Sequence, residues 1–175
     1  MDNITTCIAS HPFWAGTAPE QIAKLARFAK LGRYGVGDLI FQERHEADHL
    51  YLLHRGHVAL EAFLPGTGVT TVSVLGPGEA LGWSWLFEPY QWQYSARSVD
   101  ATEVIAFSAT ELREMAEQSP AFGRELVTRM AQVLLQRLQA ERHKLNEMQS
   151  AQNQPLADVL GDLDEEGEAA VDRRP

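Results

Sequence analysis

Short apolar runs separated by glycine-containing turns fill the middle of the chain and constrain its fold more than any other feature. Between Tyr34 and Phe107 these runs are rich in Val, Leu, Ile, Tyr and Phe. The turns that separate them are Gly37-Asp38, Arg55-Gly56, Pro65-Gly66-Thr67-Gly68, Gly76-Pro77-Gly78 and Asp100-Ala101. Regularly spaced short strands of this kind predict a β-sandwich or barrel.

Helix signals lie on both sides of this region. Upstream, Thr17-Ala18-Pro19-Glu20 combines a capping residue with an early proline and predicts a helix from about Ala18 to Lys30. Downstream, the capping box Ser108-Ala109-Thr110-Glu111 predicts a short helix that ends near Glu117. The expected fold class is therefore mainly β with flanking helices.

A long C-terminal helix is predicted after Ser119-Pro120, because no proline or glycine follows between Arg124 and Gln154. An apolar stripe runs along this helix at steps of three and four residues. Its apolar members are Val127, Ala131, Leu134, Leu138, Leu145 and Met148, and Glu141 occupies the step between Leu138 and Leu145. Such a stripe fits a seam between two helices and predicts a homodimer, although it could instead pack on its own domain. Met130 and Val133, on a neighbouring face, could cover the β-domain.

Acidic residues outnumber basic ones by 24 to 15, and much of the excess lies at the C-terminus. Residues 149–175 contain seven acids, two bases and no aromatic residue, which predicts a disordered acidic tail. Leu156, Val159, Leu160 and Leu163 could alternatively form a short helix that docks on a partner. The expected organisation is an extension over residues 1–10, a helix and β-roll over 11–118, a dimerisation helix over 119–148 and the tail over 149–175.

The composition also bears on location and partners. The single cysteine, Cys7, cannot form an intrachain disulfide, and the N-terminus lacks the basic and apolar segments of a secretory signal. No stretch approaches the ~20 apolar residues of a membrane span. We therefore expect a cytoplasmic protein without a membrane partner. We also expect no nucleic-acid partner, because the chain is acidic and the 27 residues after Met148, which carry a net negative charge, cannot build a winged helix.

Histidines occur in two patterns that resemble metal sites. His45-Glu46-Ala47-Asp48-His49 has the spacing of a zinc-protease motif, but this segment is predicted to be a turn between two strands rather than a helix. His54, His57 and Glu61 could serve a metal-dependent, cupin-like β-roll enzyme, yet ligands on one strand need even spacing and Gly56 separates the histidines. We expect no metal, and the metal-dependent enzyme remains an alternative.

The segment from Gly76 to Phe87 carries the most information about function. A glycine-bounded turn that leads into a short apolar helix would present backbone N–H groups and a helix N-terminus to a phosphate or carboxylate. The glycines could equally serve only to turn the corner of a β-roll whose core the tryptophans fill. The residues alone leave both interpretations open.

Three segments of the strand-rich region place glycines at fixed positions. They are Gly37-Asp38-Leu39-Ile40-Phe41-Gln42-Glu43, Arg55-Gly56-His57-Val58 and Leu75-Gly76-Pro77-Gly78-Glu79-Ala80-Leu81-Gly82. With the order of elements, they resemble the cyclic-nucleotide-binding domain of the catabolite activator protein superfamily over roughly His11 to Met148. The resemblance implies a jelly-roll β-roll in which a Gly-Glu pair binds the ribose 2′-hydroxyl and an arginine binds the cyclic phosphate. Arg44 stands where that family has a glycine.

The sequence departs from the family pattern at both ligand-binding positions. With Gly82 set on the family's cassette glycine, the glutamate position holds Trp83, and the phosphate-arginine position falls at Trp92 or Gln93. Arg97-Ser98 supplies an arginine further along the chain, which could replace the lost charge.

Three uses of the pocket therefore stay open: a genuine cyclic AMP or cyclic GMP sensor using that arginine, a site for another small ligand, or a ligand-free role. In the last, the aromatic cassette or the acidic tail would contact a protein partner. Gly82, Trp83 and Ser84 would offer N–H groups to an anion, and Arg137 or Glu141 could close over it. We predict a non-catalytic regulatory module without a cofactor, although a cyclic nucleotide is a possible ligand, and expect it to signal through protein partners.

Overall fold

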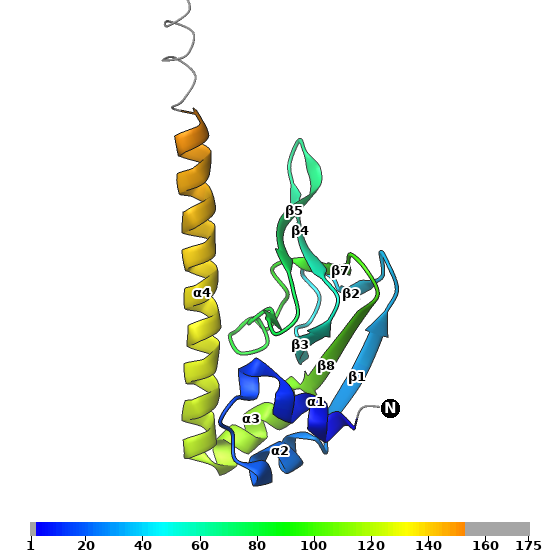
Figure 1. Cartoon of the computed structure of the whole chain (residues 1–175), viewed down its shortest axis with the longest axis vertical. Helices are drawn as coiled ribbons and strands as arrows, with labels where there is room; N and C mark the ends of the chain where they lie inside the picture. The colour runs from blue at the N-terminus through cyan, green and yellow to red at the C-terminus, as the bar shows by residue number, and fades with distance from the viewer. Residues whose placement is uncertain (1–2, 153–175) are drawn as a thin grey trace, which may run out of the picture. The chain divides into compact units, whose positions relative to one another are not determined.

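The computed structural model of this chain describes residues 3–152. The chain divides into two compact units, residues 1–133 and residues 134–175. The first unit holds all the strands and most of the helices, whereas the described part of the second unit is the C-terminal stretch of helix α4 (Pro120–Gln152) (Figure 1).

Within residues 3–152, eight strands form two antiparallel four-stranded sheets. The strands are β1 (Ala29–Tyr34), β2 (Leu39–Phe41), β3 (His49–Arg55), β4 (Val58–Leu64), β5 (Gly68–Leu75), β6 (Ala80–Leu81), β7 (Ser95–Ser98) and β8 (Thr102–Ser108). The strand order is β1-β8-β3-β6 in the first sheet and β2-β7-β4-β5 in the second. The predicted β-roll with flanking helices is confirmed, and the hairpin between β4 and β5 turns at Pro65-Gly66-Thr67 as expected (Figure 1).

Burial on both faces distinguishes the first sheet. Four consecutive residues of β3, Leu50 to Leu53, are buried, because one face of the sheet lines the roll and the helices cover the other. Trp14 is the centre of that helical cover. Its ring packs 5.8 Å from Phe107 of β8 and 6.1 Å from Phe122 of α4, measured between ring centroids.

The N-terminal helices differ from the sequence prediction. Helix α2 (Pro19–Leu25) ends before Ala29, which begins β1, so the helix predicted to reach Lys30 is wrong beyond Leu25. Pairing of β1 with β8 outweighs the local helical spacing there. The N-cap is Ala18, and the Thr17 hydroxyl donates instead to Glu125 at 3.1 Å.

Two further N-terminal elements were not predicted from the sequence. Helix α1 (Ile4–Ser10) is capped by Asn3, whose side chain accepts a hydrogen bond from the Thr5 N–H group, and a 3-10 turn η1 (Pro12–Trp14) follows. These elements lie in what the sequence assigned to an N-terminal extension and the start of the domain, and they bury Ile8 and Trp14.

The C-terminal helices begin where the sequence predicted. Ser108 caps α3 (Ala109–Gln118), and α4 starts at Pro120 and continues to Gln152, past the expected boundary at residue 148. As predicted, Met130 is buried in the core of the β-domain and Val133 packs against it. The expectations for residues 153–175 lie outside the described residues.

Most of the apolar stripe of α4 is exposed to solvent in the single chain, and Leu134 is half-buried. Val127, Leu138, Leu145 and Met148 are each more than half exposed, from 53% to 68%, and Leu135 adds a further exposed side chain at 54%. A helix that buries one face while exposing a second apolar face has surface left for a partner.

Candidate functional site

The segment between β6 and β7, residues 82–94, is the structural counterpart of the ligand cassette expected from the sequence. It consists of bends and turns with one isolated β-bridge, between Gln91 and Glu46, so the short apolar helix predicted after Gly82 is absent from this described segment. Without that helix there is no helix N-terminus to attract an anion. The segment also contains no Lys, Arg or His, and its only charged residue is Glu88.

Trp92, which belongs to this segment, packs inside the roll. Its ring stacks on Phe41 of β2, with centroids 3.8 Å apart and planes 15° apart, and lies 6.1 Å from Tyr51 of β3. Only 3% of Trp92 is exposed. Burial, aided by the nearby Tyr34 and Asp48, raises the pKa of the Tyr51 phenol, so Tyr51 stays neutral in this aromatic cluster.

Backbone hydrogen bonds hold the segment against the turn that joins β2 to β3. The Trp92 N–H group donates to the His45 carbonyl at 2.9 Å, and the Arg44 N–H group donates to the Trp92 carbonyl at 2.7 Å. Arg44 has a φ of +67°, a left-handed conformation that favours glycine, and glycine is the residue that the sequence resemblance implies at this position. The Ala47 N–H group donates to the Tyr90 carbonyl at 2.7 Å and completes the seam.

The other cassette residues point to different surroundings. Trp85 and Ser84 are buried, Trp83 is half-buried against the core, and Gln93 is exposed. Arg113 of α3, which the sequence analysis missed, donates to the Trp85 carbonyl at 2.7 Å. Its guanidinium also stacks over the ring of Tyr90 at 4.9 Å. No local motif marks Arg113, since it approaches the segment only through the tertiary fold.

Arg97 lies on the outer face of the second sheet. On β7, Ala96 and Ser98 are buried, while Ser95 and Arg97 point the opposite way. The Arg97 guanidinium pairs with the Glu61 carboxylate at 3.1 Å and donates to the Gly37 carbonyl at 2.8 Å. Arg97 and the indoles of the roll therefore face opposite sides of the sheet, and replacement of the phosphate arginine by Arg97 stays a prediction.

Other polar side chains near the expected site form hydrogen bonds that stabilise turns. The Ser98 hydroxyl donates to the Gly35 carbonyl at 2.7 Å, and the Glu79 carboxylate accepts from the Gly76 N–H group at 2.7 Å. The Asp100 carboxylate accepts from the backbone N–H group of His57 and pairs with its ring, both at 2.7 Å, and these contacts hold the pKa of Asp100 below its ordinary value.

The alternative metal centre finds no support in this geometry. His57 pairs with Asp100 and Glu61 with Arg97, and the segment His45 to His49 is a loop that enters β3, not a helix. Within residues 3–152, no three His, Cys, Asp or Glu side chains are grouped so that they could hold a metal ion.

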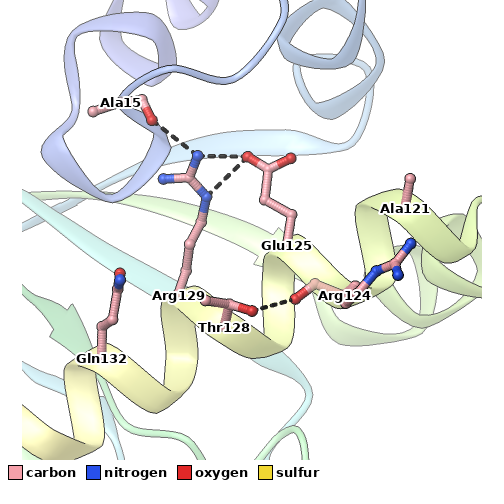
Figure 2. Close-up of a pocket in the computed structure, with 7 residues that line it drawn as sticks. All are labelled: Ala15, Ala121, Arg124, Glu125, Thr128, Arg129 and Gln132. Atoms are coloured by element: carbon pink, nitrogen blue, oxygen red, sulfur yellow. Dashed lines mark hydrogen bonds and ion pairs between the residues drawn. The ribbon is translucent and has the colours of Figure 1, made fainter.

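A groove of about 500 Å³ lies where the N-terminal segment meets the first turns of α4 (Figure 2). Arg129 closes one side of it. Its guanidinium bonds to Glu125, to the Ala15 carbonyl at 2.9 Å and to the Thr17 hydroxyl at 3.0 Å, and it also donates to the Phe13 carbonyl. These bonds occupy the Arg129 donors and connect residues 13–17 to α4. Arg129 therefore has a structural role in this groove.

The comparisons with known proteins agree on the family. The family model for the cyclic nucleotide-binding domain matches residues 31–119. The chain therefore belongs to the cyclic nucleotide-binding domain family, as the sequence resemblance predicted. The members of this family are cyclic-nucleotide-binding regulators, and such regulators are generally non-catalytic.

Two curated relatives are similar to most of this chain. The cyclic AMP receptor protein of Thermus thermophilus is 28% identical over 123 residues, covering 70% of this chain and 57% of that protein. A CRP-like cAMP-activated global transcriptional regulator of Mycobacterium tuberculosis is 23% identical and covers 85% of this chain and 63% of its own length. The chain thus spans about three fifths of these curated relatives.

A solved structure agrees with the fold. A putative cyclic nucleotide-binding protein from Geobacter metallireducens superposes with a TM-score of 0.66 at 31% identity, covering 79% of this chain and 98% of that one.

In this chain, Arg137 and Glu141 lie on α4 in the second unit, where Glu141 pairs with Lys144 at 3.1 Å. Their predicted role in closing over a ligand stays a prediction. Among the described residues, no helix is long and apolar enough to cross a membrane.

Proposed function

We propose that this chain is a non-catalytic regulatory module whose cassette has lost cyclic-nucleotide recognition in the family's manner and which acts through protein contacts. The observation that carries the proposal is the aromatic filling of the roll. Trp92 is stacked on Phe41 at 3.8 Å, and no cationic side chain comes from residues 82–94. A buried phosphate without a paired cation is expensive, so this interior is poorly suited to a cyclic nucleotide.

The geometry of Arg97 supports the same proposal. To serve a ligand in the roll, Arg97 would have to leave Glu61 and the Gly37 carbonyl and cross to the other face of its strand. Glu61 would then lose its partner with only 14% of its side chain exposed. Both steps cost free energy that a ligand would need to supply.

A homodimer through α4 is the second part of the proposal. The exposed stripe that includes Val127, Leu138 and Leu145 repeats at steps of three and four residues, which suits a helix–helix seam. The cassette itself offers a protein partner the half-exposed Phe87, which is 52% exposed, as an apolar contact. No cofactor takes part.

Isothermal titration calorimetry with cyclic AMP and with cyclic GMP tests the proposal on the full chain. We expect no saturable heat from either nucleotide. Saturable binding would overturn the proposal, and its loss in Arg97→Ala but not in the control Arg33→Ala would identify a genuine sensor that uses Arg97. Arg33 suits the control because it also pairs with a glutamate across neighbouring strands, Glu103 at 2.9 Å.

A further inference from the structure

The four edge strands of the two sheets are protected to very different degrees. An unpaired edge offers free backbone N–H and C=O groups to any other strand, and proteins usually blunt it with charges, short length or bulges. β1 carries Lys30 and Arg33, β6 has two residues, and β2 has three residues with an irregular register. These three edges follow the usual protection.

β5 is the exception. It is the last strand of the second sheet, and its eight residues, Gly-Val-Thr-Thr-Val-Ser-Val-Leu, contain no charge and no proline. Its register with β4 shifts once, which leaves Val72 as an extra residue at a bulge. Two short uncharged stretches, Gly68 to Thr71 and Ser73 to Leu75, remain on either side of that bulge.

Because of the bulge, Val69 and Val74, near the two ends of β5, lie on the same face of the sheet. Val69 lies opposite Phe63 and Val74 lies opposite Ala59, and these β4 residues alternate along the outer face. Val69 and Val74 are 67% and 54% exposed. Thr70 and Ser73, opposite Ala62 and Leu60, belong to the other side of the strand.

We infer that β5 pairs with β5 of a second copy of this chain, antiparallel, about a two-fold axis at the bulge. In this register Val69 faces Val74 of the second copy, and Thr70 faces Ser73 of the second copy. Apolar residues meet apolar residues, hydroxyl groups meet hydroxyl groups, and no like charges oppose each other. Such self-complementarity is what an interface between identical copies requires. The contact is separate from the proposed α4 seam.

The test uses the full chain with Leu138→Glu, which removes the α4 seam, and measures mass by light scattering over a concentration series. We expect a reversible rise to dimer mass. Adding Val69→Lys with Val74→Lys places lysines opposite lysines and should abolish that rise. Adding Val69→Lys with Val74→Glu instead places lysine opposite glutamate and should restore it. Val36→Lys, at a 75% exposed valine outside β5, should leave association unchanged.

The two charged double variants alter the same exposed positions, so a difference between them reports pairing rather than folding, and matching circular dichroism spectra confirm that both fold. Hydrogen exchange provides a second measurement: amides of residues 68–75 should gain protection as concentration rises, whereas those of β1 should not. The inference is wrong if Leu138→Glu stays monomeric throughout. It is also wrong if both double variants lose association alike, or if residues 68–75 are protected equally at every concentration.

Discussion

Gly82 lies so close to Trp92 that a Cβ atom added to the glycine would be 2.6 Å from Cζ3 of the indole. The φ of Gly82 is +73°, so a side chain there meets both a strained backbone and the buried ring. The absence of a side chain at residue 82 is therefore what allows Trp92 to occupy the roll.

Gly82→Ala should lower the free energy of unfolding by about 2–4 kcal/mol, because left-handed strain and overpacking against Trp92 add together. Gly66→Ala is the matched control, since its φ is +85° and nothing lies within 4 Å of the added Cβ. The control should cost only about 1–2 kcal/mol. Urea unfolding measures both; equal losses would show that contact with Trp92 adds nothing.

Arg129→Ala should lower the free energy of unfolding by about 1.5–3 kcal/mol, because the Phe13 and Ala15 carbonyls and the Glu125 carboxylate lose a charged donor. Arg129→Lys should recover only part of this, since an ammonium group cannot reproduce the guanidinium fork. Arg124→Ala, at an exposed arginine on the same helix, should change stability by less than about 0.5 kcal/mol. Full recovery of stability in Arg129→Lys would contradict a structural role for the guanidinium group.

The stability of the fold should depend on pH through His11. Burial lowers the pKa of His11 below its ordinary value of 6.5, against an opposing hydrogen bond to the Leu53 carbonyl at 3.1 Å and with a further lowering from His54. The Nδ1 atom accepts from the Phe13 N–H group, so the folded ring is neutral with its proton on Nε2.

Below pH 6.5 the unfolded chain binds a proton at His11 that the folded chain does not, so acidification favours unfolding. The free energy of unfolding should fall as the pH drops through 6.5 and level off only below the folded pKa. His11→Gln keeps a donor for the Leu53 carbonyl but should remove much of this slope, whereas His143→Gln, at an exposed histidine, should retain it. Urea titrations between about pH 8 and about pH 5 measure the slope.

At concentrations too low for β5 to pair, Leu138→Glu should convert the proposed α4 dimer to monomers, because it places a carboxylate in the exposed apolar stripe. Gln136→Glu introduces the same charge at an exposed position off the stripe and should leave the dimer intact. Sedimentation velocity at low concentration compares the two. If neither or both variants dissociate the dimer, the stripe is not its seam.

Much of the fold could be predicted from local patterns. Glycine turns such as Pro65-Gly66-Thr67-Gly68 restrict the backbone whatever surrounds them, and the Ser119-Pro120 start of α4 depends only on neighbouring residues. The error at residues 26–30 has the opposite origin. Helical spacing there was genuine, but all six residues of β1 pair with β8, from which they are separated by roughly seventy residues of sequence.

The candidate site was less predictable for the same reason. The sequence alone determined that residues 82–94 lack a cation and are rich in aromatic side chains. It could not determine which face of Ser95-Ala96-Arg97-Ser98 lies inside, because alternation gives two faces and only pairing with β2 and β4 chooses between them. As a result of that pairing, Arg97 lies next to Glu61 on the outer face. The missing side chain at Gly82 leaves the space that Trp92 occupies. Local chemistry thus set the composition of the site, while long-range packing decided what each side chain can reach.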